Sequence, residues 1–126
     1  MADSFKLLGS YEVNPLGNPL SFAPQVVAQI SESKTLKVKQ VVDITLGVDT
    51  PVVVPFGGVV NANVVILKAI GGKVSAGVTS ADGAAQAVPF DSYWILMSDS
   101  VPVTALALTR TAGVITTVRV FLGEKS

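Results

Sequence analysis

The side chains able to do chemistry in this chain are carboxylates, lysines, tyrosines and serines, because the sequence contains no histidine and no cysteine. Those two residues are the usual general base, thiol nucleophile and transition-metal ligands. A carboxylate pair could still hydrolyse a glycoside, and Asp91 and Asp99 flank the run Tyr93–Met97. The extended residues between the two acids hold them more than about 20 Å apart. We therefore expect them to lie in turns, and we expect neither an enzyme nor a bound cofactor or metal.

A second candidate site is the run Gly71-Gly72-Lys73-Val74-Ser75, which is close to a phosphate-binding loop. Such a loop has its lysine followed directly by serine or threonine, an earlier glycine, and a helix after it. Here Val74 intervenes, and a run typical of a strand follows. The pattern favours a tight turn.

The charge balance bears on nucleic-acid binding. Nine basic residues are matched by nine acidic residues, so the formal net charge is +0. Nucleic-acid-binding domains normally carry a basic excess. Lys37 and Lys39 share one face of a predicted strand, and we interpret them as its solvated face.

Tyr93 and Trp94 are the only adjacent pair of large aromatic residues with polar tips. On a strand they point to opposite faces, so one could enter the core while the other anchors a binding surface. If the strand is central, both could instead pack in the core.

The elements that must position these residues are organised around the run from Val59 to Ser80. Two stretches rich in β-branched residues flank Gly71-Gly72, which predicts a β-hairpin. The first stretch ends in consecutive apolar residues, Val64 to Leu67. That ending indicates burial on both faces of the strand.

The rest of the chain also indicates strands. Apolar and polar residues alternate between Leu36 and Leu46, with Leu36 on the same face as Val38, and again from Val114 to Leu122. Turn residues such as Asp82-Gly83 separate the runs. About eight or nine short strands predict an all-β protein with an antiparallel β-sandwich, for which eight strands in two sheets is the jelly-roll count.

Residues 1–35 differ from residues 36–126 within what we predict to be a single domain overall. Phe5–Val13 could be a strand, but Pro15, Pro19 and Pro24 then argue against a central strand and against a helix. We expect an extended, proline-stiffened arm that either lies across another chain or packs on its own domain. Residues 25–31 could form a short strand or a short helix, and residues 32–35 a polar turn.

Composition favours association. Hydrophobic residues make up 49% and charged residues 14% of the chain, against about a quarter charged in ordinary soluble domains. With no net charge, such a protein would risk precipitation unless partners cover part of its surface, so we expect a homo-oligomer. No run approaches a membrane helix and the first residues lack the apolar core of a signal peptide, which predicts synthesis in a cytoplasm and no membrane partner.

The order of these runs resembles the small all-β virion proteins of tailed bacteriophages. The residues that carry the resemblance are the alternating run from Leu36, then Pro51–Val54, Val64–Lys68, Val88–Leu96, Val101–Leu108 and Val118–Gly123. It implies a structural protein of the virion, made in the host cytoplasm, that acts as a capsid cement or decoration protein. The implied partners are the major capsid protein or another virion protein, and copies of the chain itself. The interface candidates are Pro15, Leu16, Pro19, Leu20, Phe22, Tyr93 and Trp94.

Two other functions remain open from the sequence. One is a tail, baseplate or fibre-associated component of the same kind of particle. The other is a carbohydrate-binding or adhesion module that uses Tyr93 or Trp94 as a stacking platform.

Overall fold

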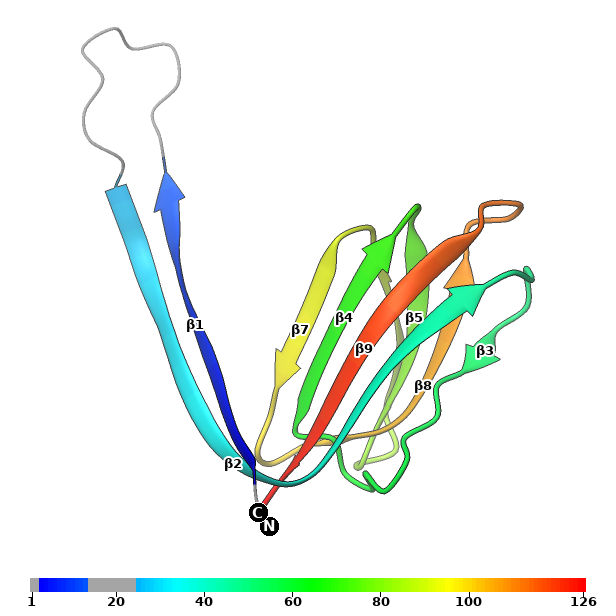
Figure 1. Cartoon of the computed structure of the whole chain (residues 1–126). Coiled ribbons are helices and arrows are strands. Elements are labelled where there is room, and N and C mark those ends of the chain that lie inside the picture. The colour runs from blue at the N-terminus through cyan, green and yellow to red at the C-terminus, as the bar shows by residue number, and fades with distance from the viewer. Residues whose placement is uncertain (1–2, 14–24) are drawn as a thin grey trace, which may run out of the picture. The chain divides into compact units, whose positions relative to one another are not determined.

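The computed structural model describes residues 3–13 and 25–126, and every regular element among them is a β-strand (Figure 1). The chain divides into two compact units, of which Ser4–Thr35 forms the smaller and Leu36–Ser126 with Asp3 the larger. The predicted proline-stiffened arm, residues 14–24, lies outside the described residues. So do the interface candidates Pro15, Leu16, Pro19, Leu20 and Phe22.

The smaller unit is a two-stranded ribbon, in which β1 (Asp3–Val13) pairs with the first part of β2 (Gln25–Leu46). β2 runs without a break through the residues expected to form a short strand or helix and a polar turn. Residues 25–31 are therefore strand, which was one of the two alternatives, and not helix. The expected polar turn at residues 32–35 is wrong because Glu32-Ser33-Lys34-Thr35, although polar, contains neither glycine nor proline and can extend.

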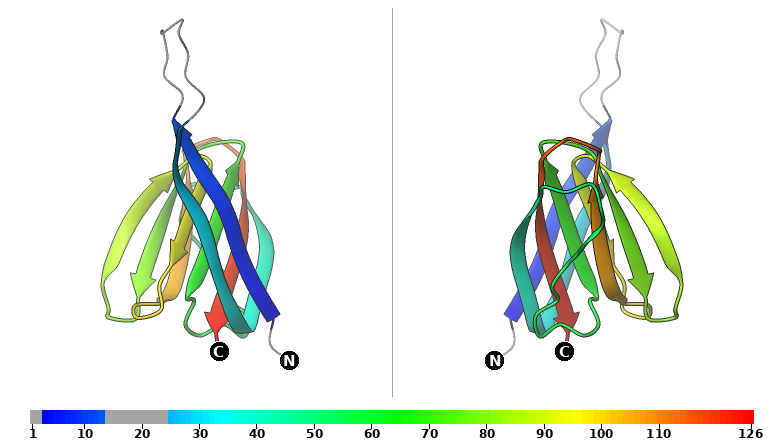
Figure 2. Two further views of the ribbon diagram at one scale, coloured as in Figure 1. Left: turned by 90° about the vertical axis from the view of Figure 1, so that its left-hand side faces the viewer. Right: turned by 90° about the vertical axis from the view of Figure 1, so that its right-hand side faces the viewer.

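The larger unit has two antiparallel sheets, which form the two layers seen in Figures 1 and 2. The first sheet continues from β2 in the order β2-β9-β4-β7, and the second has the order β3-β8-β5-β6. The predicted antiparallel β-sandwich is confirmed. Its remaining strands are β3 (Val52–Val53), β4 (Val64–Ile70), β5 (Val74–Ser80), β6 (Ala85–Phe90), β7 (Tyr93–Met97), β8 (Val103–Arg110) and β9 (Thr116–Lys125).

The strand pairs of the larger unit are nested. β5 pairs with β6, β4 with β7, β3 with β8, and β2 with β9, each pair enclosing the one before it along the chain. Lateral pairs β4–β9 and β5–β8 then join these into the two sheets. The chain between Leu36 and Ser126 is therefore one long antiparallel hairpin, folded across itself into two layers.

The core lies between the layers and follows the predicted alternation. Val118, Val120 and Leu122 of β9 are fully buried, as are Leu106 and Leu108 of β8 in the opposite sheet. Burying each of these side chains contributes about 1.5–3 kcal/mol. The strand predicted to be buried on both faces is β4, which lies between β9 and β7 and has Val64, Val65 and Leu67 fully buried.

The predicted hairpin at Gly71-Gly72 is wrong. β4 and β5 belong to different sheets, so the glycine turn carries the chain from one layer to the other. Gly71 has a φ of +106°, and a Cβ on Gly72 would lie 2.8 Å from Val114 Cγ1. The glycines are needed for positive φ and for this close approach. Neither requirement reveals whether the flanking strands pair.

β6 contains Pro89. The proline is tolerated because β6 is the last strand of its sheet, where one side of the strand makes no ladder hydrogen bonds. The Asp82-Gly83 turn that precedes β6 is confirmed, with Gly83 at a φ of +87° and Asp82 Oδ1 accepting a hydrogen bond from the Ala84 N–H.

A β-bulge marks the point where β2 enters the larger unit. Its register against β9 shifts between Leu36 and Val38, which places Leu36 opposite Lys125 and Val38 opposite Glu124. The expectation that Leu36 shares a face with Val38 is therefore wrong, because a bulge inserts one residue and reverses the alternation. Leu36 is instead buried against Gly123, where a Cβ would lie 2.8 Å from Leu36 Cδ1.

We predict that Gly123→Val will destabilise the larger unit, because the added side chain must displace Leu36. Overpacking of this kind costs about 1–3 kcal/mol, measurable by urea unfolding. Gly47→Ala is the control, since no atom lies within 4 Å of a Cβ placed there. Its free energy of unfolding should stay within about 0.5 kcal/mol of the wild type. Equal stability of the two variants would contradict the proposed contact.

Candidate functional site

β7 carries the two aromatic site candidates, and the structure places them on opposite faces. Trp94 points inward and packs, partly buried, against the core. Tyr93 lies on the outer face with 57% of its surface exposed. The Lys68 ammonium lies 5.3 Å from the centre of the Tyr93 ring, which is a cation–π distance. Of the two aromatics, Tyr93 is therefore the one available at the surface.

The outer face of the first sheet carries a row of apolar residues that the sequence analysis did not single out. The registers place Val41, Phe121, Ile66 and Ile95 side by side on β2, β9, β4 and β7. Val41 is 61% and Ile95 44% exposed, while Phe121 and Ile66 are partly buried. In the sequence, these residues can be recognised only as one apolar residue at an outward position of each strand. Seeing that the four residues form a row requires the strand order and register.

Charged residues follow this apolar row along one side. The next row holds Asp43, Arg119, Lys68 and Tyr93, in which Arg119 Nε lies 3.1 Å from Asp43 Oδ1. Both partners are exposed, so the ion pair adds little stability. An apolar strip with a charged border is the composition of a protein-binding surface.

A buried polar cluster lies at the end of β9. Glu124 is 6% exposed, and its Oε1 accepts hydrogen bonds from the N–H groups of Val60 and Asn61 at 2.8 and 3.1 Å. Its Oε2 lies 3.0 Å from Lys37 Nζ. The Val60 N–H is the main cause that lowers the pKa of Glu124 below its usual value, with further lowering from Lys37. This carboxylate is held ionised by structural donors.

Asn63 completes the cluster. Its amide donates to the Ser98 carbonyl at 2.9 Å, and its Oδ1 accepts from the Lys125 N–H at 3.0 Å. Both of these bonds are to backbone groups of neighbouring segments. The cluster therefore holds chain ends together and presents no group to a substrate.

A second cluster joins two loops at the other end of the sandwich. Arg110 Nε donates to Asp49 Oδ1 at 2.9 Å, and the Gly113 N–H donates to the same oxygen at 3.0 Å. The Gly113 N–H, followed by Arg110, lowers the pKa of Asp49. Asp49 thereby connects the β2–β3 loop to the β8–β9 loop.

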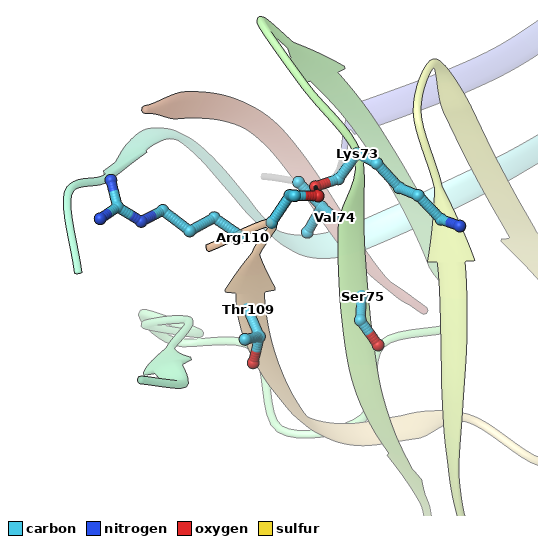
Figure 3. Close-up of a pocket in the computed structure, with 6 residues that line it drawn as sticks. Lys73, Val74, Ser75, Thr109 and Arg110 are labelled. Carbon is cyan, nitrogen blue, oxygen red and sulfur yellow. Dashed lines mark hydrogen bonds between the residues drawn. The ribbon is translucent and has the colours of Figure 1, made fainter. Parts of the chain in front are cut away.

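Beside this cluster is an open hollow of about 250 Å³ (Figure 3). It is lined by the start of β5 with the residue before it, and by the end of β8 with the residue after it: Lys73, Val74, Ser75, Thr109, Arg110 and Thr111. The Lys73 and Arg110 side chains extend in opposite directions, away from each other (Figure 3). No charged groups converge here as they do in small-molecule sites.

The remaining candidates do not assemble a reaction centre. Asp99 lies 3.8 Å from Lys125 Nζ, beyond the end of β7. Within residues 3–13 and 25–126, no three acidic side chains gather where a metal ion could bind. The same residues include no helix long and apolar enough to cross a membrane.

Comparison with known proteins identifies no relative: no family model matches the chain, and neither a curated protein nor a solved structure matches it.

We predict that Glu124→Gln will lower the free energy of unfolding at pH 7 by about 1–2 kcal/mol, because hydrogen bonds to a charged acceptor are stronger than those to a neutral one. The Glu124 pKa is lower in the folded than in the unfolded chain, so its contribution is full above its unfolded pKa of about 4.3 and is lost as pH falls through the lower folded value. The difference between wild type and variant should therefore shrink below about pH 4.

Urea unfolding of both proteins from pH 7 to pH 3 measures this difference. Lys37→Met is the matched control, because it leaves the Val60 N–H, the main cause of the lowered pKa, in place. It should keep most of the wild-type pH dependence. A difference between wild type and Glu124→Gln that stays constant with pH would contradict the prediction.

Proposed function

We propose that this chain is a non-enzymatic structural protein of a bacteriophage virion that binds the capsid shell as a cement or decoration protein and assembles as a homo-oligomer. The observation that carries the proposal is the nested pairing of the eight strands, from β2–β9 inward to β5–β6. We infer that this is a jelly roll, an architecture used by viral capsid domains and also by lectins and cupins.

The smaller unit supports the proposal. Ser4–Thr35 is a compact unit of two paired strands. A two-stranded ribbon has too little core to be stable in water by itself. Leu8 on β1 is 70% exposed. Such a ribbon is suited to dock on a partner surface, and a shell that repeats the same surface many times would supply it.

The composition of the larger unit fits the same mechanism. The outer face of its first sheet combines the apolar row of Val41, Phe121, Ile66 and Ile95 with a charged border that contains the Asp43–Arg119 ion pair. Apolar area removed from water stabilises contacts by about 25 cal/mol per Å². Repetition around a shell adds avidity that one copy lacks.

A tail, baseplate or fibre-associated component is the alternative within the same particle, because the same sandwich and ribbon serve either location. The experiment that decides uses the full chain mixed with empty shells, and separately with tail fractions, from its source. Cosedimentation with shells supports the cement proposal, and cosedimentation with tails supports the alternative. Binding to neither would overturn the virion proposal.

For shell binding through the smaller unit we predict that Leu8→Lys will weaken cosedimentation. Burying one leucine contributes about 1.5–3 kcal/mol, so its loss should reduce affinity about 10- to 100-fold. Val53→Lys is the matched control, since Val53 is 75% exposed on β3 of the other sheet. Equal weakening by both substitutions would count against docking through the ribbon.

The exposed Tyr93, together with the lectin use of this architecture, favours a carbohydrate-binding module as a second candidate. The Lys68 ammonium already lies over the Tyr93 ring. We therefore expect that a glycan array will show no binding that differs between the wild type and Tyr93→Ala. A glycan bound by the wild type and lost in a folded Tyr93→Ala would support the carbohydrate function instead.

A further inference from the structure

Apart from β1 of the smaller unit, the strands that end the two sheets are β3, β6 and β7, and these three differ in how far they could accept another strand. β3 is only two residues long, and β6 contains Pro89. β7 is longer than β3 and contains no charge, proline or bulge. Natural sheet edges are normally protected by short length, charge, proline or bulges. Among these three edges, β7 alone has no such protection.

The hydrogen bonds show which backbone groups of β7 face outward. Ala69 N–H donates to the Ser92 carbonyl, and Ser98 N–H donates to the Asn63 carbonyl, at 2.8 and 2.9 Å. In an antiparallel ladder the residues that bond to one neighbour alternate with those that face away. Trp94 and Leu96 therefore bond to β4. The N–H and C=O groups of Tyr93, Ile95 and Met97 face the open edge.

β6 provides the internal comparison. Ser80 N–H donates to the Ala84 carbonyl at 2.9 Å, and Thr79 is in register with Ala85. By the same alternation, Ala85, Ala87 and Pro89 face the open edge of β6. Pro89 thus removes an N–H that another strand would need, whereas the equivalent positions of β7 keep all of theirs.

We propose that the β7 edge pairs with the β7 edge of a second copy of this chain. A twofold axis at Ile95 sets Ile95 opposite its equivalent and Tyr93 opposite Met97, so that all three outward positions of each copy are used. The apolar row of the outer face ends at Ile95 and would continue without interruption into the row of the second copy. This continuity is the argument for a second copy as the partner.

The pairing also covers side chains at the edge. Tyr93 and Ile95, 57% and 44% exposed, are covered on the side that faces the second copy. Trp94 and Leu96 are only partly buried on the inner face and gain cover there. The contact is isologous, so it closes as a dimer and leaves no free β7 edge for further growth.

Ile95→Pro tests the pairing. The N–H of Ile95 faces away from β4, so replacing Ile95 with proline leaves the β4–β7 hydrogen bonds intact. It removes both of the Ile95–Ile95 hydrogen bonds at the twofold axis. We expect the dimer dissociation constant, measured by analytical ultracentrifugation, to rise about tenfold or more. The matched control is Ala87→Pro, at an outward position of β6, which should leave the dimer unchanged. Ile95→Lys is a second variant in case the proline disturbs the fold.

Hydrogen exchange supplies an independent readout. The amides of Tyr93, Ile95 and Met97 should be protected in the wild-type dimer. In Ile95→Pro, which has no amide at position 95, the amides of Tyr93 and Met97 should exchange freely. A wild-type protein that remains a monomer of 13.0 kDa, or a dimer that persists in both Ile95 variants, would overturn the proposal.

The inference is independent of the virion proposal except for the homo-oligomer that both contain. Monomers that bind shells would overturn the β7 pairing and the homo-oligomer while leaving the virion location supported. Dimers that bind neither shells nor tails would overturn the virion proposal alone.

Discussion

The end of the sandwich where β9 finishes depends on the interactions of one buried group, the Glu124 carboxylate. Removing a carboxylate from water is costly unless donors replace the lost solvent. Val60, Asn61 and Lys37 supply those donors from the β3–β4 connection and from β2. β9 is a central strand of its sheet. Through the Glu124 side chain, the end of β9 is bonded to Val60 and Asn61, which lie more than 60 residues away in the sequence.

Next to this carboxylate, the register of β2 against β9 shifts. The bulge between Leu36 and Val38 turns Leu36 to the outer face, where it lies against Gly123, and leaves Lys37 to reach Glu124. The same strand continues beyond Leu36 into the two-stranded ribbon. The residues that stabilise the end of the sandwich are thus also those at which the ribbon begins.

The two outer faces of the sandwich differ in chemistry. On the first sheet, Ile66 and Ile95 continue an apolar row beside the Asp43–Arg119 ion pair. On the second sheet Gly77, Ala87 and Ala107 share one register row with the exposed Val53. The outward isoleucine and aromatic side chains, Ile66, Ile95, Phe121 and Tyr93, lie on the first sheet. Both proposed contacts of the larger unit, through its face and through the β7 edge, therefore involve that sheet.

The sequence by itself determined the local geometry. Alternation of apolar and polar residues predicted the strands and their inward residues, such as Val118, Val120, Leu106 and Leu108, because side-chain direction on a strand reverses at every residue. It also predicted that Tyr93 and Trp94 point to opposite faces of a strand, but the choice of Trp94 for the inner face came only from the tertiary structure. Tertiary structure alone decided which strands pair. Gly71-Gly72 has the chemistry of a hairpin turn yet connects two layers, and Leu36 keeps the parity of Val38 in sequence yet loses it at a bulge. Pairing depends on contacts between residues far apart in the chain, and local pattern carries no information about the partner. The outer apolar row and the open edge of β7 therefore follow from the strand order and cannot be read from the sequence of any one strand.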